Sequence, residues 1–193
     1  MKAIKRKVLV VIFMLGTLIN YANNETEFTN VNAKKVRVVF NNVNKGQTLT
    51  IKDKFGFVLH KETVTKKGYL TKVFDLSSLN NGTYEIELQK DFEIVVKPFT
   101  VVNKNVIFNK ELEKTIFKPI VRNNKNVLMI SRVSFDKEPI KVELFYNDNS
   151  IYTETVNSKN ITNRTYKLDK KLKGNYKVII STNNRKFYNN FKI

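Results

Sequence analysis

Apolar and polar residues alternate along most of the chain after residue 22, which is the pattern of half-buried β-strands. In one clear example, Tyr84, Ile86 and Leu88 would share one face of a strand. Glu85 and Glu87 would lie on the other face, where carboxylates are usually solvated. Turn residues separate such segments, and the first half of the chain therefore predicts seven short strands, at residues 26–31, 35–40, 47–53, 56–64, 69–75, 83–89 and 93–101.

The same pattern returns in the second half of the chain at an offset of about 92 positions. Phe99 then corresponds to Phe191, and one residue of slippage makes Val142 the best match for Leu49. Because the repeated positions are mostly apolar, the repeat indicates two copies of one packed core. The second set of strands is expected at residues 117–122, 126–133, 139–146, 150–156, 163–168, 175–181 and 186–193.

Seven short antiparallel strands at this spacing are typical of a β-sandwich with Greek-key connections. We therefore predict an all-β chain: two tandem seven-stranded Ig-like β-sandwiches after an N-terminal signal peptide. The sequence assigns residues 23–103 to the first sandwich and residues 104–193 to the second. Residues 103–114 contain apolar side chains and no Gly or Pro, so we expect them to pack against one sandwich or to extend a strand.

A glycine followed two positions later by a tyrosine occurs at the same place in both units, as Gly82 with Tyr84 and as Gly174 with Tyr176. Glycine suits a tight turn, and sandwiches of this kind often place a corner tyrosine after it, with the hydroxyl bonded to nearby backbone. We predict that these four residues form a structural corner in each unit. The alternative is that each tyrosine is an ordinary core aromatic.

The first residues of the chain have the features of an export signal. Basic residues precede an apolar run at residues 8–19, which is shorter than the ~20 residues of a membrane-spanning helix. Residues 1–22 are therefore predicted to be a secretory signal peptide, with an uncleaved membrane anchor as the alternative. The chain contains no Cys, so the exported protein would be stable without disulfide bonds.

The formal net charge of the chain is +18 at pH 7. Such a charge attracts polyanions, although lysines spread over many strands also form an ordinary solvated surface. No specific nucleic acid is expected as a partner. If an anionic polymer or glycan is bound, the densest basic group of the second unit is the predicted site: Lys170, Lys171, Lys173, Lys177, Arg185 and Lys186.

Residues for catalysis are not grouped in the sequence in any familiar motif. His60 is the only histidine, and there is no Cys, so neither a catalytic triad nor a zinc site is easily assembled. No phosphate-binding glycine loop occurs. We therefore expect a non-enzymatic protein without a cofactor or metal, and we expect it to be a monomer.

Two segments carry a family resemblance. One is an apolar strand that ends in Asp53 and is followed by Gly56, and the other is the run Asp75-Leu-Ser-Ser-Leu-Asn-Asn-Gly-Thr-Tyr84. Together they resemble the C-terminal sorting domain of the type IX secretion system of Bacteroidota, a seven-stranded Ig-like sandwich, and the second unit matches more loosely. The resemblance implies a location in the periplasm, on the outer-membrane surface or outside the cell. It also implies a surface or secreted interaction module with a protein or glycan partner at the cell envelope.

Overall fold

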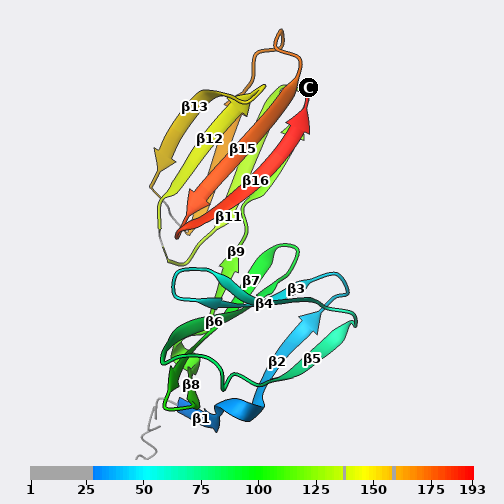
Figure 1. Ribbon diagram of the computed structural model, residues 1–193. Helices are drawn as coiled ribbons and strands as arrows, with labels where there is room; N and C mark the ends of the chain where they lie inside the picture. Colours follow the sequence, from blue (N-terminus) through cyan, green and yellow to red (C-terminus); the bar gives the residue numbers. More distant parts are fainter. Residues whose placement is uncertain (1–27, 137, 158–159) are drawn as a thin grey trace, which may run out of the picture.

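The structure is a computed structural model of the chain and describes residues 28–136, 138–157 and 160–193. The predicted signal peptide, residues 1–22, lies outside the described residues. The described residues form antiparallel β-sheets and two short 3-10 helices, which confirms the prediction of an all-β fold. Figure 1 shows two sandwiches arranged end to end, with β9 (Lys114–Phe117) at the junction between them.

The first sandwich packs a large sheet, in the order β1-β8-β7-β6-β3-β4, against the two-stranded sheet β2-β5. Strand β9 also pairs with β7. Buried side chains from both sheets, such as Phe40 and Ile86, form one core. The remaining elements are β1 (Phe28–Asn32), η1 (Ala33–Lys35), β2 (Val36–Val43), β3 (Thr48–Asp53), β4 (Val58–Thr63), β5 (Gly68–Phe74), β6 (Gly82–Gln89), β7 (Glu93–Val102), β8 (Asn105–Asn109) and η2 (Lys110–Leu112).

The second sandwich packs the sheet β10-β11-β14 against the sheet β13-β12-β15-β16. Its core is separate and includes Leu128, Ile130, Val142, Val178 and Ile180. The seven strands are β10 (Ile120–Asn124), β11 (Val127–Val133), β12 (Ile140–Tyr146), β13 (Asn149–Val156), β14 (Ile161–Lys167), β15 (Asn175–Thr182) and β16 (Arg185–Lys192).

The strand registers agree with the internal repeat. Leu49 lies opposite Leu88 in the β3–β6 pair, and Val142 lies opposite Ile180 in the β12–β15 pair. Leu49 and Val142 are therefore equivalent, which confirms the single residue of slippage in the alignment. Strands β1 to β7 correspond in order to β10 to β16.

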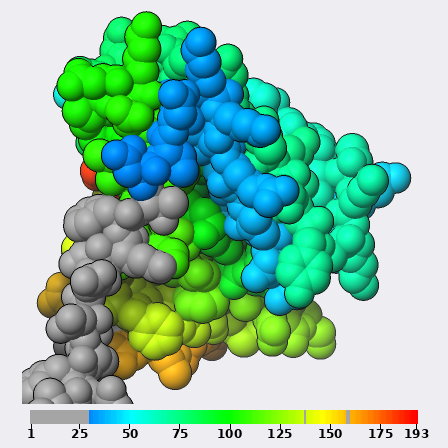
Figure 2. Space-filling view, turned by 90° about the horizontal axis from the view of Figure 1, so that it is seen from below, coloured from blue at the N-terminus to red at the C-terminus, as the bar shows by residue number. Residues whose placement is uncertain are grey.

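The two sandwiches differ at one edge strand. Strand β10 pairs with β11, but its counterpart β1 pairs with β8 instead of β2. Helix η1 separates β1 from β2, and the amide of Ala33 in η1 donates to the carbonyl oxygen of Lys104 at 3.0 Å. Figure 2 shows β1, η1 and β2 across the end of the first sandwich.

The segment between the units extends the large sheet of the first sandwich. This agrees with one of the two alternatives predicted for residues 103–114, packing against one sandwich or extending a strand. Residues 105–109 form β8 and residues 114–117 form β9, and both strands pair with β7. The sequence assigned these residues to the second sandwich, whereas their backbone pairing is with the first. The first sandwich therefore has two strands more than the seven expected.

Asparagine-rich pairs close three of the hairpins. Both residues have positive φ in Asn103-Lys104, Asn147-Asp148 and Asn183-Asn184. This is the backbone of type I′ turns, whose twist suits antiparallel strands and which Asn tolerates better than most residues. The abundant asparagines of the sequence thus have a local structural role.

Gly82 and Gly174 have almost identical φ angles, 159° and 158°, but differ in the space around them. A Cβ atom added at Gly174 would lie 2.9 Å from Cε2 of Tyr146, whereas at Gly82 the nearest atom, on Tyr84, would be 3.8 Å away. The Tyr146 hydroxyl donates to the carbonyl oxygen of Lys173 at 2.9 Å, which limits how far the ring can move.

We therefore expect Gly174→Ala to lower the free energy of unfolding by about 1–3 kcal/mol more than Gly82→Ala, because overpacking strains the neighbouring side chains. Equilibrium urea denaturation of the two variants would measure the difference. Equal losses would show that the Tyr146 ring moves aside freely. Combining Gly174→Ala with Tyr146→Ala should remove part of the difference. The remainder would come from Oδ1 of Asn147, which would lie 3.0 Å from the added Cβ atom.

Candidate interaction surfaces

The corner tyrosines make matching hydrogen bonds in the two sandwiches. The Tyr84 hydroxyl donates to the carbonyl oxygen of Asn80 at 2.9 Å, and the Tyr176 hydroxyl donates to that of Leu172 at 2.9 Å. Both rings also belong to the packed cores. Burial raises the pKa of Tyr176 above its ordinary value, so its hydroxyl stays protonated and able to donate. Each tyrosine thus combines the two roles that the sequence left open, because its hydroxyl bonds to nearby backbone while its ring packs in the core.

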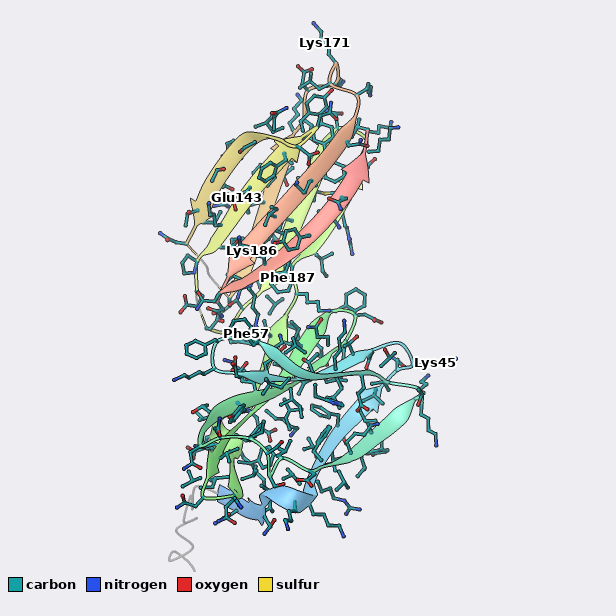
Figure 3. All side chains as sticks on the ribbon, in the orientation of Figure 1. Lys45, Phe57, Glu143, Lys171, Lys186 and Phe187 are labelled. Carbon is teal, nitrogen blue, oxygen red and sulfur yellow. The ribbon has the colours of Figure 1, made fainter. Side chains whose placement is uncertain are left out.

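The six basic residues predicted as a polyanion site do not form one patch. Lys170, Lys171 and Lys173 lie exposed in the loop between β14 and β15. Arg185 and Lys186 begin β16, at the other end of the β15–β16 hairpin. Figure 3 shows Lys171 at the end of the second sandwich remote from the first, and Lys186 at the end that faces it. The eight residues of β15 separate the two groups by about 25 Å, at ~3.3 Å per residue.

Lys177 and Arg185 already form ion pairs with other side chains of the protein. The Lys177 ammonium lies 4.9 Å from the centre of the Phe145 ring and 3.0 Å from Oδ1 of Asp148. Arg185 contacts two carboxylates of the first sandwich, Glu85 and Glu87. The lysines of the predicted site that remain exposed are therefore the three in the β14–β15 loop and Lys186, which lies at the other end of the β15–β16 hairpin.

Glu87 is the centre of an ion cluster between the sandwiches. Its side chain is 0% exposed, although strand alternation placed it on a solvated face, and that expectation was wrong. Oε2 accepts from Nζ of Lys52 at 2.6 Å, and Oε1 accepts from Nη2 of Arg185. Arg185, the first residue of β16 in the second sandwich, thus contacts the outer face of β6.

Opposing effects act on the pKa of Glu87. Burial alone raises it, but hydrogen bonds and charge from Arg185 and Lys52 outweigh burial and hold the pKa below its ordinary value of 4.5. The carboxylate is therefore ionised at neutral pH. Phe187 adds apolar contact beside the cluster, because it packs against Ile94, Val96 and Ile116 of the first sandwich.

A cleft of about 1220 Å³ lies at this junction. Its walls come from the β3–β4 and β6–β7 turns, from β9, and from β10 and β16 of the second sandwich. Three aromatic side chains on its walls are unusually exposed: Phe55 is 74% exposed, Phe92 68% and Tyr188 62%. Charged groups of both signs, including Asp91 and Lys186, also line the cleft.

The turn that carries Phe55 is held in a fixed shape. Oδ1 of Asp53 accepts from the amides of Phe55 and Phe57, each at 2.9 Å. The Lys54 ammonium lies 4.9 Å from the centre of the Phe55 ring. The backbone of Phe92 is fixed as well, because its carbonyl oxygen accepts from the amide of Lys118 at 2.9 Å.

Tyr188 lies on the regular strand β16, so all three rings are presented by ordered backbone. Such rings bind a ligand with little loss of conformational freedom, and aromatic faces stack on flat apolar surfaces. The site could not be predicted from the sequence, because the three rings come from distant parts of the chain. Of the three rings, Tyr188 alone is among the tyrosines, with Tyr146 and Tyr152, for which the sequence suggests stacking on sugars or bases, the alternative being cross-strand packing.

Two other features are absent from the described residues. Within residues 28–136, 138–157 and 160–193, no cluster of three or more His, Cys, Asp or Glu residues is placed to bind a metal ion. In the same part of the chain, no helix has the length and apolar character needed to cross a membrane.

Comparisons with known proteins leave the function open. No model of a known protein family matches the sequence, and no curated protein matches it. Among solved structures, a chain described as "Biofilm associated protein - BSP domain" is similar at 15% sequence identity and a TM-score of 0.27. The match covers 84% of this chain and 28% of that chain. At this TM-score the similarity supports no conclusion about function.

Proposed function

We propose that this chain is an exported, non-enzymatic interaction module that binds a glycan or protein partner at the cell envelope. The observation that carries the proposal is the junction cleft, where Phe55, Phe92 and Tyr188 are exposed on ordered backbone. Export is supported by the signal-like pattern of residues 1–22 and by the resemblance to type IX sorting domains. Exposed aromatic rings among charged groups are a common composition of binding surfaces.

Replacing the three rings by serine should strongly weaken ligand binding at the cleft. We expect the variant Phe55→Ser/Phe92→Ser/Tyr188→Ser to bind roughly 30-fold or more weakly, since an aromatic anchor often contributes 2 kcal/mol or more. The measurement is binding of the full chain to an array of neutral and anionic oligosaccharides in ~0.15 M salt, where surface charge is screened over ~8 Å.

The matched control replaces three equally exposed aromatics that lie outside this cleft, in the variant Phe57→Ser/Tyr69→Ser/Phe135→Ser. This control should bind the same oligosaccharides as the unchanged chain. If the cleft variant kept its affinity, or if both variants lost it equally, the cleft would not be the binding surface.

The exposed β14–β15 loop favours a second function, binding of an anionic polymer. Lys170, Lys171 and Lys173 lie within four positions of one another and are all exposed. Oδ1 of Asp169, the nearest carboxylate in sequence, accepts from the backbone amide of Lys171 at 2.8 Å. Three ammonium groups on one loop can approach a chain of sulfates or phosphates together.

Changing these three lysines to alanine should weaken retention on immobilised heparin and reduce the salt dependence of binding by about three counterions. The control is Lys45→Ala/Lys66→Ala/Lys67→Ala, which removes the same charge from exposed positions on the first sandwich. Figure 3 shows Lys45 far from Lys171. An equal effect of the two variants would mean that heparin responds only to net charge.

A further inference from the structure

Equivalent strands of the two sandwiches differ in what covers their outer edge. Strand β7 pairs with β6 on one side and with β8 and β9 on the other. Its counterpart β16 pairs with β15, and no strand within the described residues pairs with its other side. The first sandwich thus shows, in the same molecule, what a covered edge of this kind looks like.

The hydrogen-bond pattern identifies the free groups of β16. The amides of Gly174 and Ile193 donate to each other's carbonyl oxygens at 3.0 and 3.1 Å. In an antiparallel pair, hydrogen-bonded residues alternate with residues whose N–H and C=O point away. The groups that face away from β15 therefore belong to alternate residues of β16: Lys186, Tyr188, Asn190 and Lys192.

The same positions of β7 are occupied by partner strands, with one exception. Ile94 and Val96 lie opposite β9, and Thr100 and Val102 lie opposite β8. Pro98, between them, has no N–H to offer. Strand β16 has Asn190 at the equivalent position, so its row of backbone donors is uninterrupted.

Side-chain burial agrees with an uncovered edge. Phe99 is 2% exposed and packs 5.6 Å, ring centre to ring centre, from Phe108 of β8. Its counterpart Phe191 stacks on Tyr176 but stays partly exposed.

We infer that the free edge of β16 accepts an extended segment of another protein, which adds as an antiparallel strand whose alternate residues are apolar and acidic. Apolar residues would cover Phe191 as Phe108 covers Phe99, and acidic residues would face Lys186 and Lys192. A second copy of this chain fits less well, because like charges of two β16 strands would meet. The inference rests on the proposed role as an interaction module, and the edge of β16 adjoins the cleft, because Lys186 and Tyr188 belong to both.

The test uses a synthetic peptide, Glu-Val-Glu-Phe-Glu-Val-Glu, and the full chain labelled with ¹⁵N. We expect the peptide to shift the backbone amide signals of β16, and a peptide with Lys in place of Glu to have no effect. Asn190→Pro should weaken binding by about tenfold, because it removes one edge donor and prevents close pairing. Pro98 shows that the fold accepts proline at this place, so the melting temperature should be nearly unchanged, and Asn190→Ala should bind normally.

Other outcomes would overturn the inference. One is that the backbone amide signals of β16 do not shift at a millimolar concentration of the peptide. Another is that the Asn190→Pro variant binds the peptide as tightly as the unchanged chain does. A concentration-dependent dimer that Asn190→Pro abolishes would assign the edge to a second copy instead. If Asn190→Pro failed to fold, a peptide N-methylated at its two central Glu residues would serve. The amides of these residues would donate to the carbonyl oxygens of β16, so the methylated peptide should not bind the unchanged chain. Asn190→Pro should leave oligosaccharide binding at the cleft intact, so failure here is distinguishable from failure of the proposed cleft.

Discussion

The double variant Lys52→Ala/Arg185→Ala should lose about 3–5 kcal/mol of its free energy of unfolding, a large part of the stability of a protein of this size. Both cations that hydrogen-bond the fully buried Glu87 carboxylate would be gone. An ionised carboxylate without a partner in the interior is costly, because neither water nor protein donors replace its hydration. Equilibrium urea denaturation at pH 7 would measure the loss.

The control distinguishes an unpaired charge from lost packing. Adding Glu87→Gln to the double variant removes the buried charge while nearly keeping the volume, and it should restore a large part of the lost stability. Glu87→Gln alone should cost less than the double variant, because Lys52 and Arg185 are 17% and 20% exposed and can reach water. No recovery in the triple variant would show that the cluster acts through packing.

The cluster also gives stability a dependence on pH. The folded-state pKa of Glu87 lies below its ordinary value of 4.5, so the folded protein holds this proton less tightly than the unfolded chain. The stabilisation is fully present above about pH 4.5, and it is lost as the pH falls through the lower folded-state pKa. Glu87→Gln should remove this part of the acid sensitivity.

Strand positions and the repeat could be predicted from the sequence because both depend on local alternation and on shared apolar positions. The pair of Leu49 and Val142, for example, follows from side chains that face the same core. Pairing between distant segments has no such local sign. Nothing in the sequence around Phe28–Asn32 shows that β1 leaves β2 to pair with β8.

The candidate sites show the same limit. Alternation places Glu85 and Glu87 on the outer face of β6, but it does not indicate that a second sandwich covers part of that face. Likewise, Lys173 and Arg185 are close in sequence but lie at opposite ends of the β15–β16 hairpin. Closeness in sequence is therefore a poor guide to a charged patch in a protein made of hairpins.

Replacing Phe99 by alanine should cost about 3–5 kcal/mol, whereas Phe191→Ala, at the equivalent position, should cost roughly half as much. Both rings stack on a corner tyrosine at a centre-to-centre distance of 5.4 Å. Phe99 is also covered by Phe108, while Phe191 remains partly exposed. A less buried ring loses less transfer free energy and leaves a smaller cavity when it is removed. Urea denaturation curves of the two variants, each compared with the unchanged chain, would measure the costs.

A double-mutant cycle identifies the source of the difference. If β8 supplies the extra burial, Phe99→Ala should cost less in a Phe108→Ala background, and its cost should approach that of Phe191→Ala. Equal costs for Phe99→Ala and Phe191→Ala in the unchanged chain would mean that the second sandwich covers its edge strand as well as the first does. In that case the edge of β16 would need no added strand, and the comparison between the two sandwiches would no longer indicate a partner.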